Sequence, residues 1–235
     1  MQVEHTPAAT KYTQAQLPQS WERTGKDKPM RAFNHKIRLS TATLLAMVLA
    51  SYLYSASAAG EQLGDISSVN GGIDLASGAS AQEVGTVNGG IDLDDNVTIK
   101  HPETVNGGIR VGENVSVHGY LTTVNGGIRT GAGTVIEARV RTVNGKIQLR
   151  NTTVSENVET SNGDISLRNA SIVEGDLLVA KSRRNWWGRI WNSKRRRPEI
   201  TIDATSSVRG DIHLYREVDL RIDDAAVVGE IIRHY

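Results

Sequence analysis

The sequence predicts an all-β protein, a single-stranded parallel β-helix (β-solenoid) of about nine coils of about 18 residues, and three observations indicate this fold. A segment of the type TVNGGIDL recurs six times, with its Asn 18 or 19 residues apart. Apolar and polar residues alternate after each Asn-Gly, as they do in short strands. The chain has 23 Gly but only 5% aromatic residues, which indicates a narrow aliphatic core.

Each repeat begins with Asn-Gly, a dipeptide that favours a corner because both residues tolerate positive φ. We expect the Gly after each Asn to supply that positive φ, at Gly71, Gly89, Gly107, Gly126, Gly145 and Gly163. The Asn side chains of successive coils are expected to hydrogen-bond in a line, as in other stacks of parallel strands. This predicted Asn ladder consists of Asn70, Asn88, Asn106, Asn125, Asn144 and Asn162.

A second motif lies between the Asn-Gly corners and predicts another corner in each coil. It has the form apolar-x-Gly-x-apolar, as in VHGYL (117–121), VEGDL (173–177) and VRGDI (208–212), with VGEII (228–232) as a variant. About 18 residues then divide into three short strands joined by three corners, and equivalent residues stack about 4.8 Å apart. The spacing alone suits either hand of the coil.

The N-terminal residues predict export. Residues 30–58 resemble a signal peptide, with a basic start, an apolar run over 44–53 and the small residues Ala56-Ser57-Ala58 before the cleavage point. A retained signal-anchor is the alternative, and both place the β-helix, residues 59–235, across the inner membrane, in the periplasm, on the envelope or secreted. Residues 1–29 are expected to be a disordered or mis-annotated extension, with Met30 as the true start.

The repeat is interrupted once, by residues 181–198 (KSRRNWWGRIWNSKRRRP), here called the basic insertion. It replaces an Asn-Gly corner and holds eight of the 20 Lys and Arg that follow Ala58, whereas 23 Asp and Glu make the rest of that region acidic. Trp and Arg together favour an anionic surface, such as a membrane, lipopolysaccharide or an envelope polymer. The candidate binding residues are Arg183, Arg184, Trp186, Trp187, Arg189, Trp191, Lys194, Arg195, Arg196 and Arg197.

Two other interpretations of the basic insertion remain open. Its Trp side chains can cover the solenoid while its Arg side chains neutralise the acidic wall. Cationic and aromatic residues together also suit nucleic acid, but we expect no nucleic-acid partner for an exported protein.

No catalytic motif appears, so we expect a non-catalytic protein without cofactor or metal. The four His after Ala58 are not at metal-ligand spacing. A single cation held by Asp92, Asp94 and Asp95 and recognition through Arg209-Gly210-Asp211 are the weaker alternatives. Absence of Cys excludes disulfides, thiolate metal sites and a lipidated cysteine. An enzyme acting on polysaccharides is the remaining catalytic alternative, since such β-helices use clustered carboxylates.

The TVNGGIxL and SNGDISL coils resemble those of bacterial putative-adhesin families of unknown function. The solenoid is also similar to bactofilins, which are three-sided, right-handed β-helices that polymerise end to end. These resemblances imply a three-sided, right-handed coil and an adhesin-like or scaffold role, although the signal segment departs from the cytoplasmic bactofilins. The C-terminal VVGEIIRHY lacks an obvious polar cap, which leaves end-to-end self-association open.

Overall fold

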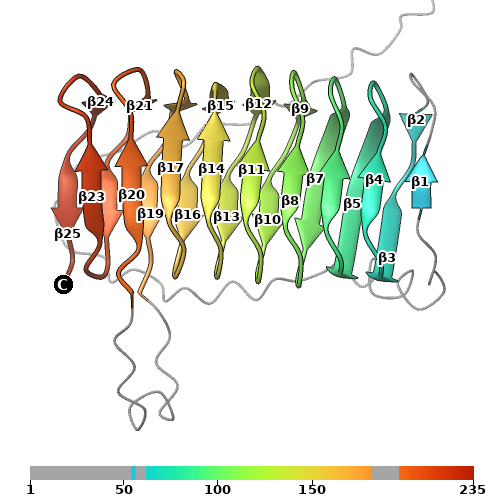
Figure 1. Cartoon of the computed structure of the whole chain (residues 1–235), viewed down its shortest axis with the longest axis horizontal. Coiled ribbons are helices and arrows are strands. Elements are labelled where there is room, and N and C mark those ends of the chain that lie inside the picture. The colour runs from blue at the N-terminus through green and yellow to red at the C-terminus, as the bar shows by residue number, and fades with distance from the viewer. Residues whose placement is uncertain (1–53, 57–61, 182–195) are drawn as a thin grey trace, which may run out of the picture. The chain divides into compact units, whose positions relative to one another are not determined.

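The computed structural model describes residues 54–56, 62–181 and 196–235, and these form a parallel β-helix without any α-helix. The described residues make about eight turns of about 19 residues. The basic insertion adds no turn, because the 35-residue step from Ile165 to its partner Ile200 advances the coil by a single turn. In Figure 1 the near strands point up while the chain advances from right to left, so the coil is right-handed.

The first face of the coil is a nine-stranded parallel sheet in which each strand pairs with the equivalent strand of the next turn. The register joins identical positions of the repeat: Ile73 lies beside Ile91, and Leu75 beside Leu93. The strands are β1 (Tyr54–Ala56), β4 (Ile73–Leu75), β6 (Ile91–Leu93), β8 (Ile109–Val111), β11 (Ile128–Thr130), β14 (Ile147–Arg150), β17 (Ile165–Arg168), β20 (Glu199–Ile202) and β23 (Asp219–Ile222).

The other two faces belong to one 16-stranded sheet, which gives the three-sided coil that was predicted. On the second face lie β2 (Gln62–Leu63), β9 (Ser116–Val117), β12 (Thr134–Ile136), β15 (Thr152–Val154), β18 (Ile172–Val173), β21 (Ser207–Val208) and β24 (Val227–Val228). On the third face lie β3 (Ile66–Asn70), β10 (Leu121–Thr123), β13 (Val140–Thr142), β16 (Val158–Thr160), β19 (Leu177–Val179), β22 (Ile212–Leu214) and β25 (Ile231–Arg233). The long strands β5 (Ser80–Asn88) and β7 (Thr98–Thr104) run from the second face to the third and join them.

These two long strands depart from the prediction of three corners in every coil. The corner glycine of the second motif first occurs at Gly119, between β9 and β10. The earlier turns have Glu83 and His101 near the equivalent position, and these residues pair within continuous strands. From Gly119 onward the second corner is a break in the strands, also in the two turns where Ala138 and Glu156 occupy the glycine position.

The core is a narrow column of aliphatic side chains, as the scarcity of aromatics predicted. Every buried core residue is Ile, Leu, Val or Ala, and most of the Ile and Leu among them are fully enclosed. The two alternate residues of each strand on the first face, such as Ile147 and Leu149, both point inward. Burial of each such side chain stabilises the fold by about 2 kcal/mol, which outweighs the low intrinsic stability of three-residue strands.

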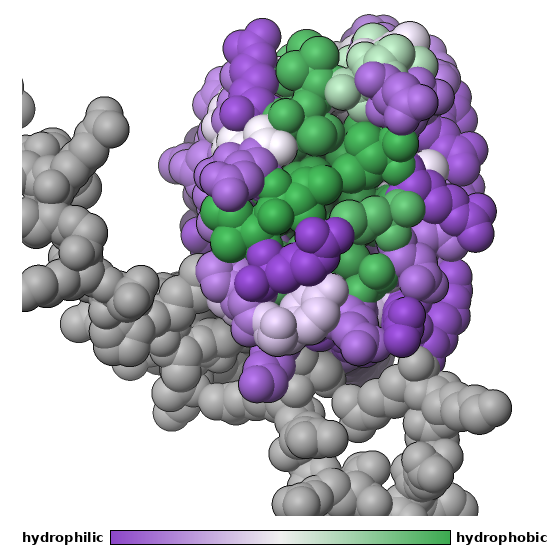
Figure 2. Space-filling model, turned by 90° about the vertical axis from the view of Figure 1, so that its left-hand side faces the viewer, coloured by the Kyte–Doolittle hydropathy of each residue, from purple (hydrophilic) through white to green (hydrophobic). Residues whose placement is uncertain are grey.

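The two ends of the coil differ. On the first face, Ile73 and Leu75 of the first turn are buried, whereas Leu220 and Ile222 of the last turn are partly exposed. On the other faces, Leu63 and Ile66 of the first turn are partly exposed as well. Figure 2 shows the C-terminal end as a hydrophobic area bordered by hydrophilic residues. The partly exposed residues of this end are Val218, Leu220, Ile222, Ala226, Val228 and Ile231.

The predicted N-terminal segments fall almost entirely outside the described residues. Within the predicted signal segment, Tyr54–Ala56 forms β1, which pairs with β4. Among the residues that the structure describes, there is no helix long and apolar enough to cross a membrane. Cleavage, export and the role of residues 1–29 therefore stay predictions.

Candidate functional site

The Asn-Gly corners carry the predicted Asn ladder. The side-chain Nδ2 of each Asn donates to the Oδ1 of the Asn one turn earlier, at 2.8 to 3.0 Å. Five such bonds join the six residues from Asn70 to Asn162, and all six side chains lie on the exposed outer surface. All bonds run in the same direction, so Asn162 at the end is left with an acceptor oxygen.

Arg216 ends the ladder. Its guanidinium donates to Oδ1 of Asn162 at 2.8 Å and to the carbonyl of Ser161 at 3.1 Å. Strand pairing places Lys181 and then Arg216 in the column that the Asn residues occupy in earlier turns. Arg216 therefore reaches across the turn in which the basic insertion begins.

The glycine that follows each Asn has a different role from the predicted one. Gly71 has a φ of 158°, close to fully extended, and no other glycine of this column has positive φ. A Cβ at Gly107 would instead overlap the carbonyl of Gly89, and the same overlap recurs at Gly89, Gly126, Gly145 and Gly163. The column needs glycine because successive turns approach each other too closely here for any side chain.

Positive φ lies at the opposite corner, between the first and second faces. Asn96, Asn114 and Asn151 have φ values of 60°, 55° and 44° there, and Gly78 and Gly133 have 76° and 74°. Asn and Gly are the residues that adopt the left-handed region most readily. The sequence contains this second column at the same period of 18 or 19 residues, and our reasoning missed it because the residue type alternates.

A column of buried Thr hydroxyls was also missed. In four of the six repeats the Thr two residues before the ladder Asn points inward and donates to the carbonyl of the corner glycine one turn earlier, for example Thr123 to Gly107 at 2.7 Å. Thr86, Thr104 and Thr142 make the same bond, at 2.8 to 2.9 Å. Thr160 is also buried, but its hydroxyl accepts the N–H of Gly163 at 3.0 Å. The signal was present as the recurring Thr of TVNGG, which stands at an otherwise apolar inward position.

The basic insertion leaves the strand pairing intact. β17 pairs with β20 from Ile165–Ile200 to Leu167–Ile202, and β19 pairs with β22 from Leu177–Ile212 to Val179–Leu214. The residues on either side therefore occupy the positions they would have without the insertion. Residues 181–198 therefore add to the sequence of one corner without changing the register of the strands, and the carbonyl of Pro198 at their end accepts the N–H of Asp219 at 2.9 Å.

Only the ends of the basic insertion are described. Arg196 forms an ion pair with Asp164 at 2.9 Å, and Arg197 with Glu217 at 2.8 Å. These two Arg side chains contact acidic residues of the solenoid, as in the neutralising interpretation. The other candidate binding residues, Arg183, Arg184, Trp186, Trp187, Arg189, Trp191, Lys194 and Arg195, lie outside the described residues.

Residues of the proposed single-cation site make contacts within the solenoid. Asp92 pairs with Arg110 at 3.1 Å, and Asp95 accepts the backbone N–H of Glu113 at 2.7 Å. Within the described ranges, no group of three or more acidic or His residues is arranged to hold a metal ion.

In the Arg-Gly-Asp segment, Arg209 pairs with Glu174 at 2.8 Å, and Asp211 accepts the backbone N–H of Glu230 at 2.9 Å. Gly210 lies between β21 and β22, at the corner that the second motif predicted. The Arg209 and Asp211 side chains therefore contact neighbouring turns, as expected for residues at a corner of the repeat.

Titratable residues gather at the corner between the second and third faces. The rings of His101 and Tyr120 stack at 4.5 Å, and Arg139 lies over the Tyr120 ring at 5.4 Å. Burial lowers the pKa of His101, and the neighbouring Glu83 partly offsets this effect. Burial likewise raises the pKa of Glu103, which lies close by. The cluster is a charged, partly desolvated part of the wall.

An open groove of about 540 Å³ runs along the outer surface of the nine-stranded sheet, beside the Asn ladder. Its floor is formed by glycines of the repeat, and we call it the cationic groove because Arg110, Arg129 and Lys146 line it. Neither these residues nor the groove were identified from the sequence, in which Arg110 and Arg129 replace the Asp that follows Ile in the first two repeats. The lining residues are Gly90, Asp92, Gly108, Ile109, Arg110, Gly127, Ile128, Arg129, Lys146 and Gln148.

Comparison with protein-family models, with curated proteins and with solved structures found no match to this chain.

Proposed function

We propose that this protein is a non-catalytic, exported cell-envelope β-solenoid of adhesin-like type, held at an anionic surface by the basic insertion. The solenoid serves as a rigid rod, and the insertion supplies the contact. The observation that supports this function is the unbroken strand pairing on both sides of residues 181–198. The strands on either side keep their register, so eight cations and three Trp added at this corner support a role in binding.

The charge distribution supports the same proposal. Arg196 and Arg197 pair with acidic residues of the solenoid, while the other six Lys and Arg of the insertion stand in a segment that has no acidic residue of its own. Trp favours the membrane–water interface, and clustered Lys and Arg attract anionic headgroups. An anionic phospholipid or lipopolysaccharide surface fits this combination.

Vesicle cosedimentation tests the proposal. We expect the protein to bind vesicles containing an anionic phospholipid, to bind neutral vesicles weakly, and to lose binding steeply as salt increases. Changing Trp186, Trp187 and Trp191 to Ala is expected to weaken binding about tenfold. The matched control changes Arg150, Arg168 and Arg221 on the solenoid to Gln, and its binding should equal that of the wild type. Equal binding by the Trp variant and the wild type would refute the proposal.

Self-association into a scaffold, as in bactofilins, is a second candidate, and the exposed C-terminal end favours it. The last strands β23, β24 and β25 stand at the ends of their sheets, with one edge unpaired among the described residues. Beneath them Leu220, Ile222 and Ile231 are partly exposed, and Val227 is 66% exposed. Unpaired edges over an apolar core pair readily with equivalent edges of a second copy.

Light scattering and sedimentation test this second candidate. The wild type is expected to form dimers or longer assemblies, and Ile231→Lys is expected to give monomers because it places a charge in the apolar contact. Val135→Lys, a change at a 44% exposed position on the side of the coil, is the control and should leave the assembly unchanged. A monomeric wild type at high concentration would exclude the scaffold role.

A further inference from the structure

The cationic groove exists because the repeat places two consecutive glycines after Asn88, Asn106 and Asn125. In consecutive turns the second of these is Gly90, Gly108 and Gly127, and these form the floor. In the next turn this position is Lys146, whose side chain lines the groove at that end. The groove therefore follows the axis of the coil and spans several turns.

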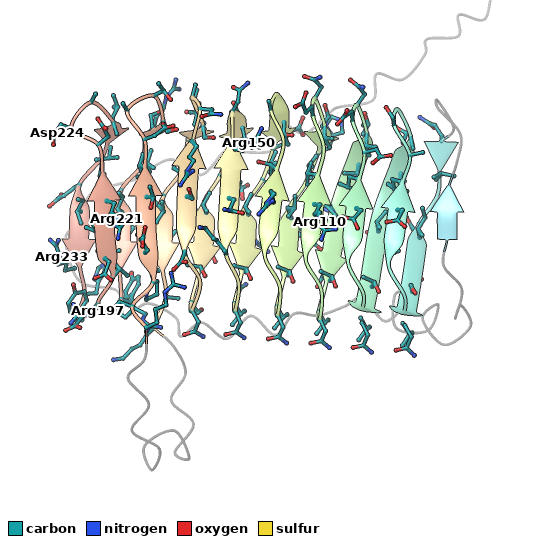
Figure 3. The ribbon with its side chains drawn as sticks, viewed as in Figure 1. Arg110, Arg150, Arg197, Arg221, Asp224 and Arg233 are labelled. Atoms are coloured by element: carbon teal, nitrogen blue, oxygen red, sulfur yellow. The ribbon has the colours of Figure 1, made fainter. Side chains whose placement is uncertain are left out.

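One wall of the groove is a single column of outward side chains. Strand pairing places Asp92, Arg110, Arg129 and Gln148 next to one another in that order, one in each turn. Adjacent parallel strands lie about 4.8 Å apart, so the backbones of Arg110 and Arg129 lie about one strand spacing from each other. The Arg110 guanidinium turns toward Asp92 of the previous turn, and Arg129 turns toward Gln148 of the next turn. Figure 3 shows Arg110 on this sheet.

The groove is positively charged in a region where acidic residues otherwise predominate. Arg110 forms an ion pair with Asp92 at 3.1 Å, and the Arg110 side chain is 77% exposed. Arg129 donates from Nε to the amide oxygen of Gln148 at 3.0 Å, a neutral partner that leaves its charge uncompensated. Within the part of the chain that the structure describes, Arg129 and Lys146 form no ion pair. Three cations against one acid give the groove a surplus of two positive charges.

We propose that the cationic groove binds a segment of a linear acidic polysaccharide, with sugar carboxylates on Arg110 and Arg129. Guanidinium groups bind carboxylates through two parallel hydrogen bonds. The groove spans several turns with cations in its lining, which suits a linear polymer that carries carboxylates. Gln148 and Asp92 add amide and carboxylate groups suited to sugar hydroxyls. No aromatic side chain lines the groove, so the stacking surface typical of single-stranded nucleic-acid sites is absent from it.

This inference goes beyond the proposed function and concerns a different part of the chain, so each can fail without the other. The full chain is titrated with oligogalacturonate, with its neutral methyl ester and with single-stranded DNA. We expect the acidic glycan to bind and its ester to bind at least tenfold more weakly. Equal binding of the ester would overturn the proposal, as would tighter binding of the DNA.

Variants locate the binding site. Arg110→Gln with Arg129→Gln is expected to weaken oligogalacturonate binding by about tenfold or more, since two charge-assisted contacts are lost. Arg221→Gln is the matched control, because Arg221 stands in the same outward column but outside the groove (Figure 3). Equal losses in the double variant and the control would overturn the proposal. A variant lacking residues 182–195 should bind the glycan like the wild type, and loss of binding would place the site in the insertion.

Discussion

The turns before and after the basic insertion are built differently at the Asn-Gly corner. From Asn88 to Asn162 each corner has a ladder Asn, a glycine in close contact with the previous turn and a buried Thr beneath it. After the insertion the same corner reads Tyr215-Arg216-Glu217, with none of these residues. The inward residues Ile200, Ile202, Ile212 and Leu214 are nevertheless fully or almost fully buried.

This difference distinguishes the interactions that form the coil from those that are specific to the Asn-Gly corner. Strand pairing and the aliphatic core continue across both regions, so they are sufficient for the β-helix. The Asn ladder, the glycine column and the Thr column are local devices that let neighbouring turns approach closely at one corner. Substitutions of these Asn, Gly and Thr residues should therefore lower the stability of the turns before the basic insertion. The turns after the insertion have no equivalent residues to substitute.

The largest effect is expected from Gly107→Ala. Its Cβ would overlap the carbonyl of Gly89, and relief of that overlap requires two turns to separate, at a cost of about 3 kcal/mol in the free energy of unfolding. Gly90→Ala is the control, because its Cβ meets the Gly108 carbonyl at 3.3 Å and the change should stay within about 1 kcal/mol. Denaturant unfolding followed by circular dichroism measures both, and equal losses would contradict the close-contact explanation.

A smaller effect is expected from Thr123→Val. The substitution keeps the shape but removes the hydroxyl that donates to the Gly107 carbonyl at 2.7 Å, in a fully buried position. Leaving that carbonyl without its donor should lower the free energy of unfolding by about 1 to 2 kcal/mol. Ser68, in the first described turn, has the equivalent position, but its hydroxyl has no partner among the described residues. Ser68→Ala should therefore leave stability almost unchanged, and a loss as large as that of Thr123→Val would count against this role.

The Asn ladder should contribute less than the Thr column because its bonds are exposed to water. Asn125→Ala removes the bonds to Asn106 and Asn144, at 2.9 and 2.8 Å, and is expected to cost about 1 kcal/mol. Asn70→Ala removes a single bond at the end of the ladder and should cost about half as much. If thermal unfolding shows the same loss for both variants, the ladder does not act as a chain of bonds.

The smallest effect is the pH dependence caused by His101. Because burial lowers its pKa below 6.5, the unfolded chain takes up a proton before the folded chain does as pH falls through 6.5. The free energy of unfolding should thus decrease as pH falls below 6.5, and His101→Gln should reduce that slope. Unfolding measured in buffers on both sides of this pH tests the expectation, which an unchanged slope in the variant would rule out.

The sequence was sufficient to predict the coil, because period and alternation report directly which residues share a face. Asn70 to Asn162 could be placed in one line for the same reason. The role of Gly107 could not be predicted, since a positive φ and a close backbone contact both select glycine. The cationic groove was missed because Arg110, Arg129 and Lys146 are 17 to 36 residues apart in the chain and become neighbours only through the register.

One-turn stacking with a constant register also determines how long the rod is. Each added or deleted repeat changes the length by one strand spacing, about 4.8 Å. The remaining turns keep the same types of contact with their neighbours. The distance from β4, in the first turn, to the corner that carries the basic insertion is therefore a whole number of such steps. Gain or loss of a single 18-residue unit would therefore move the basic insertion along the coil axis by one strand spacing, and intermediate distances are not accessible.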